Sequence, residues 1–177
     1  MTAFGFKKIG AEEDLYQYAV AALARRMRSI AELKRVLRLK VDADDYGRTL
    51  VELIIRRLKD QGYLNDAKYA TAYSSFRRDN EKFGRRRVIT DLKAKGVHGD
   101  IIAQAVTSAY EDVNEEKLAR EFLRRKRLTK PQSQRETARI FRQLMRAGFT
   151  TKAIFAILKK WDVDDETLSA LESEASE

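Results

Sequence analysis

Apolar residues recur along this chain as adjacent pairs four positions apart, a spacing that places them on one face of an α-helix. The clearest stretches begin at Leu50, Ile101 and Ala153, so the pattern returns after about 50 residues each time. Strict alternation of apolar and polar residues, which would favour strands, does not occur. With one proline and eight glycines in 177 residues, the pattern predicts helix almost throughout, organised as an internal repeat.

Two further helical segments precede each of these stretches. The segments before the second and third stretches are expected to end at Gly96 and Gly148, because glycine readily adopts the left-handed conformation that closes a helix. In the first repeat the matching helix opens with Ser29-Ile30-Ala31-Glu32, a capping box that satisfies two backbone N–H groups. The first helix of each unit contains a large apolar residue followed by alanine, for example Tyr69-Ala70. The repeating unit is therefore three helices in about 50 residues.

We therefore predict an all-α fold of three tandem three-helix repeats. One repeat is too small to bury its own apolar stripe, so the repeats are expected to stack into an elongated, curved, right-angled array of helices. Aromatic residues on these stripes are expected to pack in the core rather than to stack on bases. The expected segments are an N-terminal leader with the first repeat over 1–61, a second repeat over 62–112, a third over 113–161 and an acidic tail over 162–177.

Composition excludes several kinds of chemistry. The chain has no Cys, which rules out disulfides, zinc ribbons and thiol catalysis, and its single His98 is expected at a helix start rather than in a metal site. No nucleotide-binding, zinc-protease or hydrolase motif occurs, so we expect no catalytic residues, no cofactor and no metal. The apolar runs are too short for a membrane helix, and no signal peptide follows Met1, which favours a cytoplasmic location.

Charge is distributed unevenly along the chain. The net charge is +9, yet the segment 162–177 has no basic residue, so the rest of the chain is more strongly cationic than the total suggests. The acidic residues of this segment are Asp162, Asp164, Asp165, Glu166, Glu172, Glu174 and Glu177. They lack the glycine-containing loop of a calcium site, so we expect a solvated or self-masking tail.

Most of the 36 lysines and arginines fall in three windows, 25–40, 77–95 and 117–146, one in each repeat. Such clustering is typical of proteins that bind a polyanion, either nucleic acid or an acidic protein surface. A solvated helical surface rich in Arg and Lys is the alternative.

The sharpest basic feature lies on the helix expected after Pro131. At 100° per residue its apolar residues face one way, and four arginines line the opposite side over about 17 Å. These four are Arg135, Arg139, Arg142 and Arg146, which we call the arginine row. Arginine is suited to bidentate recognition of phosphate or carboxylate. The other candidate binding residues are Arg25, Arg26, Arg28, Lys34 and Arg35 in the first repeat, Arg86, Arg87 and Lys93 in the second, and Arg124 and Arg125 in the third.

Two runs in the middle of the chain, Gly62-Tyr63-Leu64-Asn65-Asp66 and Phe83-Gly84-Arg85-Arg86-Arg87-Val88-Ile89, resemble motifs of the RecX family, the bacterial regulators of RecA. The first run, followed by Tyr69-Ala70, is similar to the start of that family's second repeat. The second run, with Leu92 and Lys95-Gly96-Val97, is similar to its basic helix and glycine stop. The first-repeat pattern of the family is matched by Ser29, Glu32, Leu33 and Leu37.

The resemblance covers roughly residues 15–160, and two features depart from the family's pattern. Asn65 stands where the family usually has an acid, although Asn is also a good helix N-cap. The acidic tail has no counterpart that we can assign.

The resemblance implies a non-enzymatic negative regulator that binds in the helical groove of the RecA–DNA filament and bridges neighbouring protomers. Such a protein limits filament growth, ATPase activity, DNA strand exchange and the stimulation of LexA self-cleavage, and so acts in DNA repair, homologous recombination and the SOS response. The implied partners are the RecA filament and single- and double-stranded DNA, with no membrane and a monomeric chain.

Two other functional classes stay open at this point. A direct DNA-binding regulator would use a three-helix unit as a helix-turn-helix, with Arg135, Arg139 and Arg142 facing a major groove. Against it, Gln143 alone lies near the arginine row to read bases. The third class is a purely structural helical adaptor.

Overall fold

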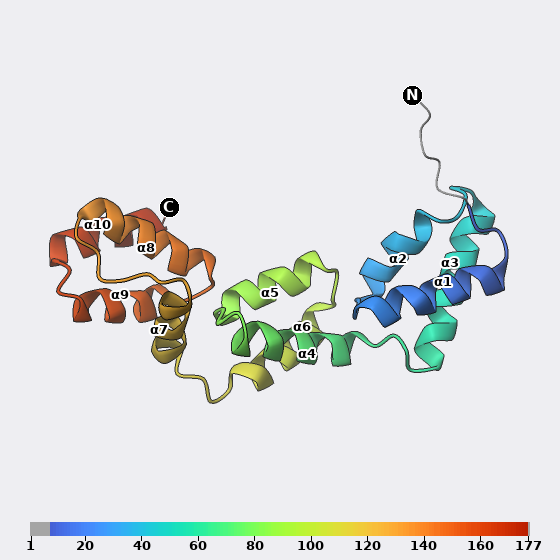
Figure 1. Ribbon diagram of the computed structural model, residues 1–177, viewed down its shortest axis with the longest axis horizontal. Coiled ribbons are helices and arrows are strands. Elements are labelled where there is room, and N and C mark those ends of the chain that lie inside the picture. The colour runs from blue at the N-terminus through green and yellow to red at the C-terminus, as the bar shows by residue number, and fades with distance from the viewer. Residues whose placement is uncertain (1–7, 177) are drawn as a thin grey trace, which may run out of the picture. The chain divides into compact units, whose positions relative to one another are not determined.

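The computed structural model describes the chain over residues 8–176, and every regular element in that part is an α-helix (Figure 1). The predicted all-α fold is therefore confirmed. The described helices are α1 (Glu12–Arg25), α2 (Ile30–Arg38), α3 (Asp45–Asp60), α4 (Asp66–Asp79), α5 (Arg85–Ala94), α6 (Gly99–Tyr110), α7 (Glu115–Arg125), α8 (Gln134–Arg146), α9 (Thr151–Lys160) and α10 (Asp165–Ser176). They form three groups of three, α1–α3, α4–α6 and α7–α9, followed by α10.

Packing groups these helices into two compact units. The first unit contains the chain through Ala70 together with Leu92–Ile102, and the second contains Thr71–Asp91 and the residues from Ala103 onward. Helices α4, α5 and α6 contribute residues to both units. The expected repeat boundaries fall between helices, but as domain boundaries they stay a prediction.

The core of the first unit is built mainly from α1, α2 and α3. Leu15, Leu33, Val51 and Leu58 are fully buried in it, as the helical spacing of apolar residues predicts. The predicted capping box is present at the start of α2, where the Ser29 hydroxyl accepts the Glu32 N–H.

The middle repeat supplies further bonds to this unit. The Ser29 hydroxyl donates to the Lys95 carbonyl oxygen at 2.6 Å, and the Ile30 N–H donates to the Asp66 carboxylate at 2.8 Å. Both acceptors lie beyond the segment expected for the first repeat, so that repeat does not complete its own hydrogen bonding.

The core of the second unit is built from α7, α8, α9 and α10. Phe149 is fully buried and meets Phe122 edge to face, with ring centroids 5.9 Å apart. Helix α10 adds Leu168 and Leu171 to this core and contacts α8 and α9.

The acidic segment therefore forms a packed helix, where its acid count led us to expect a solvated or self-masking tail. Asp162, Asp164, Asp165 and Glu166 lie at or before its start. Glu177 and the side chains of Glu172 and Glu174 lie outside the described residues.

Both glycines predicted to close helices have left-handed backbones, with φ of +73° at Gly96 and +90° at Gly148. An alanine at position 96 is expected to cost more than backbone strain, because its Cβ would lie 2.5 Å from the Ala31 Cβ. Gly62, with φ of +75° and open space around it, is the matched control. In urea unfolding, Gly62→Ala should lose about 1 kcal/mol and Gly96→Ala at least about 1 kcal/mol more. Equal losses would contradict the assigned contact with α2.

Candidate polyanion-binding surface

Helix α8 carries the arginine row, and its ends and buried face are set by its own sequence. Pro131 precedes it, the Ser133 hydroxyl accepts the Glu136 N–H at 3.3 Å, and left-handed Gly148 follows its C-terminus. Its buried face consists of Thr137, Ile140, Phe141 and Leu144. These residues determine which side of the helix faces the core. All four arginines of the row lie on the other side and are exposed.

Three members of this row form no ion pair with another described residue. Among the described residues, no acidic partner is found for Arg135, Arg139 or Arg146. An exposed guanidinium without an internal partner can bind an external carboxylate or phosphate without first breaking an ion pair. The exposed position of the row, read from periodicity alone, agrees with the structure, while its role in binding stays a prediction.

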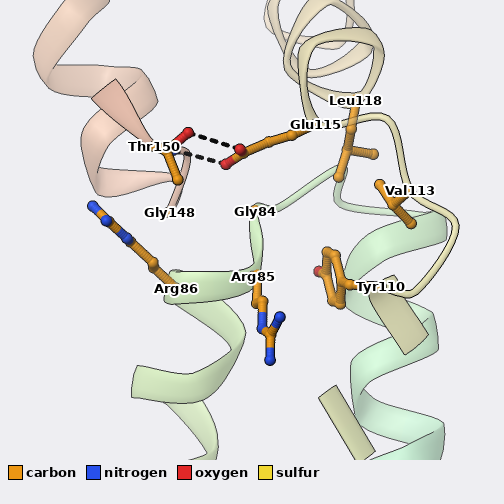
Figure 2. Close-up of a pocket in the computed structure, with 9 residues that line it drawn as sticks. All are labelled: Gly84, Arg85, Arg86, Tyr110, Val113, Glu115, Leu118, Gly148 and Thr150. Atoms are coloured by element: carbon orange, nitrogen blue, oxygen red, sulfur yellow. Dashed lines mark hydrogen bonds between the residues drawn. The ribbon is translucent and has the colours of Figure 1, made fainter. Parts of the chain in front are cut away.

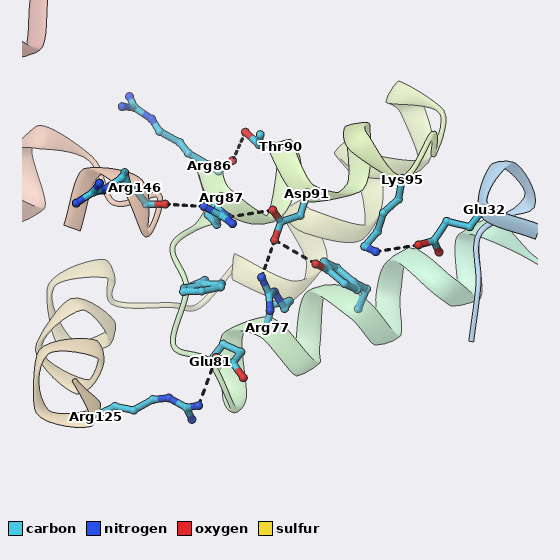
Figure 3. Close-up of polar contacts among 12 residues, drawn as sticks. Glu32, Arg77, Glu81, Arg86, Arg87, Thr90, Asp91, Lys95, Arg125 and Arg146 are labelled. Carbon is cyan, nitrogen blue, oxygen red and sulfur yellow. Dashed lines mark hydrogen bonds and ion pairs between the residues drawn. The ribbon is translucent and has the colours of Figure 1, made fainter. Parts of the chain in front are cut away.

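The start of α5 is bonded to the end of α8. The Gly84 N–H donates to the Ala147 carbonyl at 2.8 Å, and the Arg86 N–H donates to the Gly148 carbonyl at 3.2 Å. Figure 3 shows Arg86 and Arg146 at this junction, on neighbouring helix ends. The Arg86 side chain has no ion-pair partner among the described residues, so this junction extends the cationic surface of α8 onto α5.

Arg87, also predicted to bind, takes part in an internal polar cluster around Asp91 (Figure 3), and its role in binding stays a prediction. The Asp91 carboxylate accepts from Arg77 at 2.8 Å, from the Tyr73 hydroxyl at 3.1 Å and from Arg87 Nε at 2.9 Å. Burial, followed by the nearby Asp91 charge, raises the pKa of Tyr73 to about 12, so the hydroxyl keeps its proton and donates. Arg87 also reaches the Arg146 carbonyl at 3.4 Å, which ties α8 to this cluster.

Replacing Asp91 by Asn is expected to lower the free energy of unfolding by about 1.5 to 3 kcal/mol, since two guanidinium groups lose their shared anion. Exposed Asp79, which pairs with Arg78, is the matched control. Asp79→Asn should cost less than about 1 kcal/mol. Chemical denaturation of both variants measures the difference, and an equally small effect at Asp91 would show that the cluster adds no stability.

In the first unit, most of the predicted binding residues already have internal partners. Lys34 pairs with Glu52 at 2.6 Å, Arg26 lies 3.9 Å from Glu32, and Arg35 donates to the Ala94 carbonyl at 3.3 Å. The Arg28 Nε donates to the Ala22 carbonyl at 3.4 Å. Of the predicted binding residues in this unit, Arg25 and Lys93 are exposed and have no ion-pair partner among the described residues.

Glu32 is the acidic centre of this unit and holds Lys95 at 3.0 Å. Burial, the largest single influence, raises the pKa of Glu32, but bonds from Lys95, the Ser29 N–H and Tyr69 outweigh it and leave the pKa below its ordinary value. Glu32 is therefore ionised and neutralises basic charge on this unit, which weakens the first-repeat part of the predicted surface.

Arg124 and Arg125 of α7, both predicted to bind, differ in their internal partners. Arg125 donates to the Asn80 carbonyl and lies 3.3 Å from Glu81, so it connects α7 to the loop after α4. Arg124 is exposed and has no ion-pair partner among the described residues. It lines a cavity with Arg127 and Trp161, which the sequence patterns did not single out because those residues belong to separate segments.

A second cavity, of about 280 Å³, lies beside the α5–α8 junction (Figure 2). Arg85 and Arg86 line it, together with Tyr110 and Glu115. Both oxygens of Glu115 are occupied, because they accept from the Thr150 N–H and hydroxyl at 2.7 Å each. In the part of the chain that the structure describes, no group of three acidic, His or Cys residues is placed to hold a metal ion. Over the same residues, no helix combines the length and apolarity needed to cross a membrane.

Known sequences match most of this chain. A family model described as RecX, second three-helix domain, matches residues 65–106. Regulatory protein RecX of Myxococcus xanthus is 33% identical over 155 residues, which cover 80% of each chain. Regulatory protein RecX of Mycobacterium marinum is 32% identical over 142 residues, covering 78% of this chain and 79% of that one.

Other relatives are longer than this chain. Regulatory protein RecX of Bacillus pumilus is 32% identical over 146 residues, which cover 82% of this chain but 54% of the relative. The chain therefore spans about half the length of the Bacillus relatives it matches.

Solved structures show the same fold. The crystal structure of RecX from Lactobacillus salivarius superposes with a TM-score of 0.62 at 22% identity, covering 85% of this chain and 96% of that one. A second structure, described as regulatory protein RecX, has the same TM-score of 0.62 at 21% identity. At this level of sequence identity, the structural similarity establishes that this chain shares the helix arrangement of the two crystal structures.

Proposed function

Because the chain belongs to the RecX family, we propose that it is a non-enzymatic negative regulator of the RecA recombinase. In this proposal it binds in the groove of the RecA–DNA filament and limits filament growth, ATP hydrolysis, strand exchange and the stimulation of LexA self-cleavage. Its partners are RecA and the DNA within the filament.

The observation that supports this proposal most is the exposed arginine row on α8. Three of its members have no described acidic partner, and Arg86 extends the same cationic surface from the start of α5. A filament of protein on DNA offers both phosphates and protein carboxylates, and arginine binds either group in a bidentate manner. The row spans about 17 Å, so it can contact several such groups at once.

The test is RecA's DNA-dependent ATPase measured at increasing concentrations of this chain, at about 50 mM and about 200 mM salt. We expect inhibition at low salt and roughly a tenfold higher concentration for half-inhibition at high salt, because binding to phosphates displaces counterions. RecA alone at each salt concentration is the control, since RecA's own DNA binding also depends on salt. Absence of inhibition at both concentrations would refute the proposal.

A direct sequence-specific DNA regulator is the other candidate, and the exposed face of α8 is the feature that favours it. A recognition helix needs side chains that discriminate base edges, such as Asn or Gln. Gln143, the residue available for this beside the row, is half-buried rather than exposed. The surface therefore favours contacts to phosphate and carboxylate, which carry no sequence information.

A further inference from the structure

A cavity of about 400 Å³ in the second unit combines an apolar lining with a cationic one. Leu123, Leu128 and Ile157 contribute its aliphatic surface, and Trp161, which closes α9, contributes the indole ring. Arg120, Arg124, Arg127 and Lys160 line the same cavity and are all exposed. Its volume lies within the usual range for small-ligand sites, about 300 to 1,000 Å³.

The charges around this cavity do not balance. Glu116 pairs with both Arg120 and Lys160, so one carboxylate meets two cations. Among the described residues, neither Arg124 nor Arg127 has an ion-pair partner. The residues that line the cavity therefore carry a net positive charge. The charges of Arg124 and Glu121 also interact, but neither Arg124 nor Arg127 would have to break an ion pair with a described residue to accept an anion.

Arg127 occupies a backbone position that suits glycine. Its φ is +55°, a left-handed conformation that costs a non-glycine residue roughly 1 to 2 kcal/mol. Glycine holds the left-handed position after α3, α5 and α8, whereas Lys82 after α4 and Asp162 after α9 are left-handed without being glycine, as Arg127 is. The strain is therefore common to three helix ends among the described residues, and the proposal rests on the cavity lining and its charge rather than on this strain.

We propose that this cavity binds a nucleotide segment of single-stranded DNA, with a base against Trp161 and the neighbouring phosphates on Arg124 and Arg127. The aromatic and aliphatic lining matches the face of a base, and the two unpaired guanidinium groups match phosphate. In a duplex the base faces are covered by stacking, so they cannot reach the indole. This site is separate in its residues from the arginine row, and it requires no RecA.

Trp161 is the single tryptophan of the chain, so intrinsic fluorescence reports on this cavity alone. Titration of the full chain with an unlabelled oligothymidylate is expected to quench that fluorescence. Trp161→Leu, assayed by the anisotropy of a dye-labelled oligothymidylate, should bind roughly fivefold to a hundredfold more weakly, as expected for the loss of about 1 to 3 kcal/mol of stacking.

Three other ligands test the specificity of the quench. Heparin supplies negative charge without bases, a hairpin duplex supplies stacked bases, and thymidine monophosphate supplies one free nucleotide. All three should quench far less than the oligothymidylate. Equal quenching by heparin or by the duplex would overturn the base contact, and equal quenching by the monophosphate would overturn the assignment to a strand.

Two double variants with the same loss of charge locate the site. Arg124→Ala with Arg127→Gly should abolish the quench while the fold is retained, because glycine relieves the strain at position 127. Arg48→Ala with Arg56→Ala, on α3, should leave the quench largely intact, because both side chains are exposed and pair within their own helix. The proposal fails if the cavity variant is quenched like the unaltered chain, or if the α3 variant loses the quench equally. Since no RecA is present, this outcome is independent of RecA inhibition.

Discussion

Replacing Arg135 and Arg139 by glutamate is expected to abolish inhibition of RecA's ATPase at concentrations where the unaltered chain inhibits fully. Both side chains are exposed and lack a described acidic partner, so charge reversal disrupts no internal pair. Each substitution converts an attraction to phosphate or carboxylate into a repulsion, and like charges at an interface cost several kcal/mol. A loss of affinity of at least about a hundredfold follows. Arg142 is left unchanged because it takes part in a further contact.

The matched control is the double variant Arg48→Glu with Arg56→Glu, which changes the net charge equally on α3. Both of these side chains are exposed, and each makes a surface ion pair within its own helix. The control should inhibit RecA nearly as well as the unaltered chain, and circular dichroism should show unchanged helix content in both variants. Full inhibition by the α8 variant would show that the arginine row is not part of the interface with the filament. Equal loss in both would show that net charge, rather than the row, drives binding.

Truncation of Phe149 to alanine is expected to destabilise the second unit by about 3 to 5 kcal/mol. The ring is fully buried in the core of α7, α8 and α9 and meets Phe122 at 5.9 Å, so its removal leaves a cavity that the surrounding helices cannot fill. Thermal unfolding followed by circular dichroism measures the effect as a lower midpoint.

Phe76→Ala is the control for this variant, since Phe76 belongs to the same unit but is 54% exposed. It should change stability by less than about 0.5 kcal/mol. A similar loss in the two variants would mean that Phe149 does not occupy the packed core.

Local features were predicted well from the sequence. The helical repeat, the capping box at Ser29 and the left-handed backbone at Gly96 all depend on residues within one or two helical turns. The exposed face of α8 also follows from local periodicity, because Ile140 and Leu144 fix which side of the helix is buried.

Features that depend on contacts between distant segments were missed. Lys34 has the same local sequence features as the other basic residues of its window, and only the fold places Glu52 beside it. In the same way, Arg77 of α4 pairs with Asp91 of α5. The cavity at Trp161 joins residues from α7 and α9, which no local pattern relates.

Helix α10 was not predicted from the sequence, for a different reason. The acids of its segment dominate the composition, while Leu168 and Leu171, the residues that bury it, are too few to stand out as a stripe.

The hydrogen bonds of Ser29 and Ile30 bear on how this protein can be dissected. A fragment ending at residue 61 has a complete repeat by its sequence, yet it lacks the Lys95 carbonyl and the Asp66 carboxylate that these groups require. With the covering segment removed, water would replace these partners, and the fragment would lose the net stabilisation of the two hydrogen bonds, about 0.5 to 1.5 kcal/mol each. We therefore expect a fragment that extends through Ile102, which keeps both of these bonds, to be more stable than one that ends at residue 61.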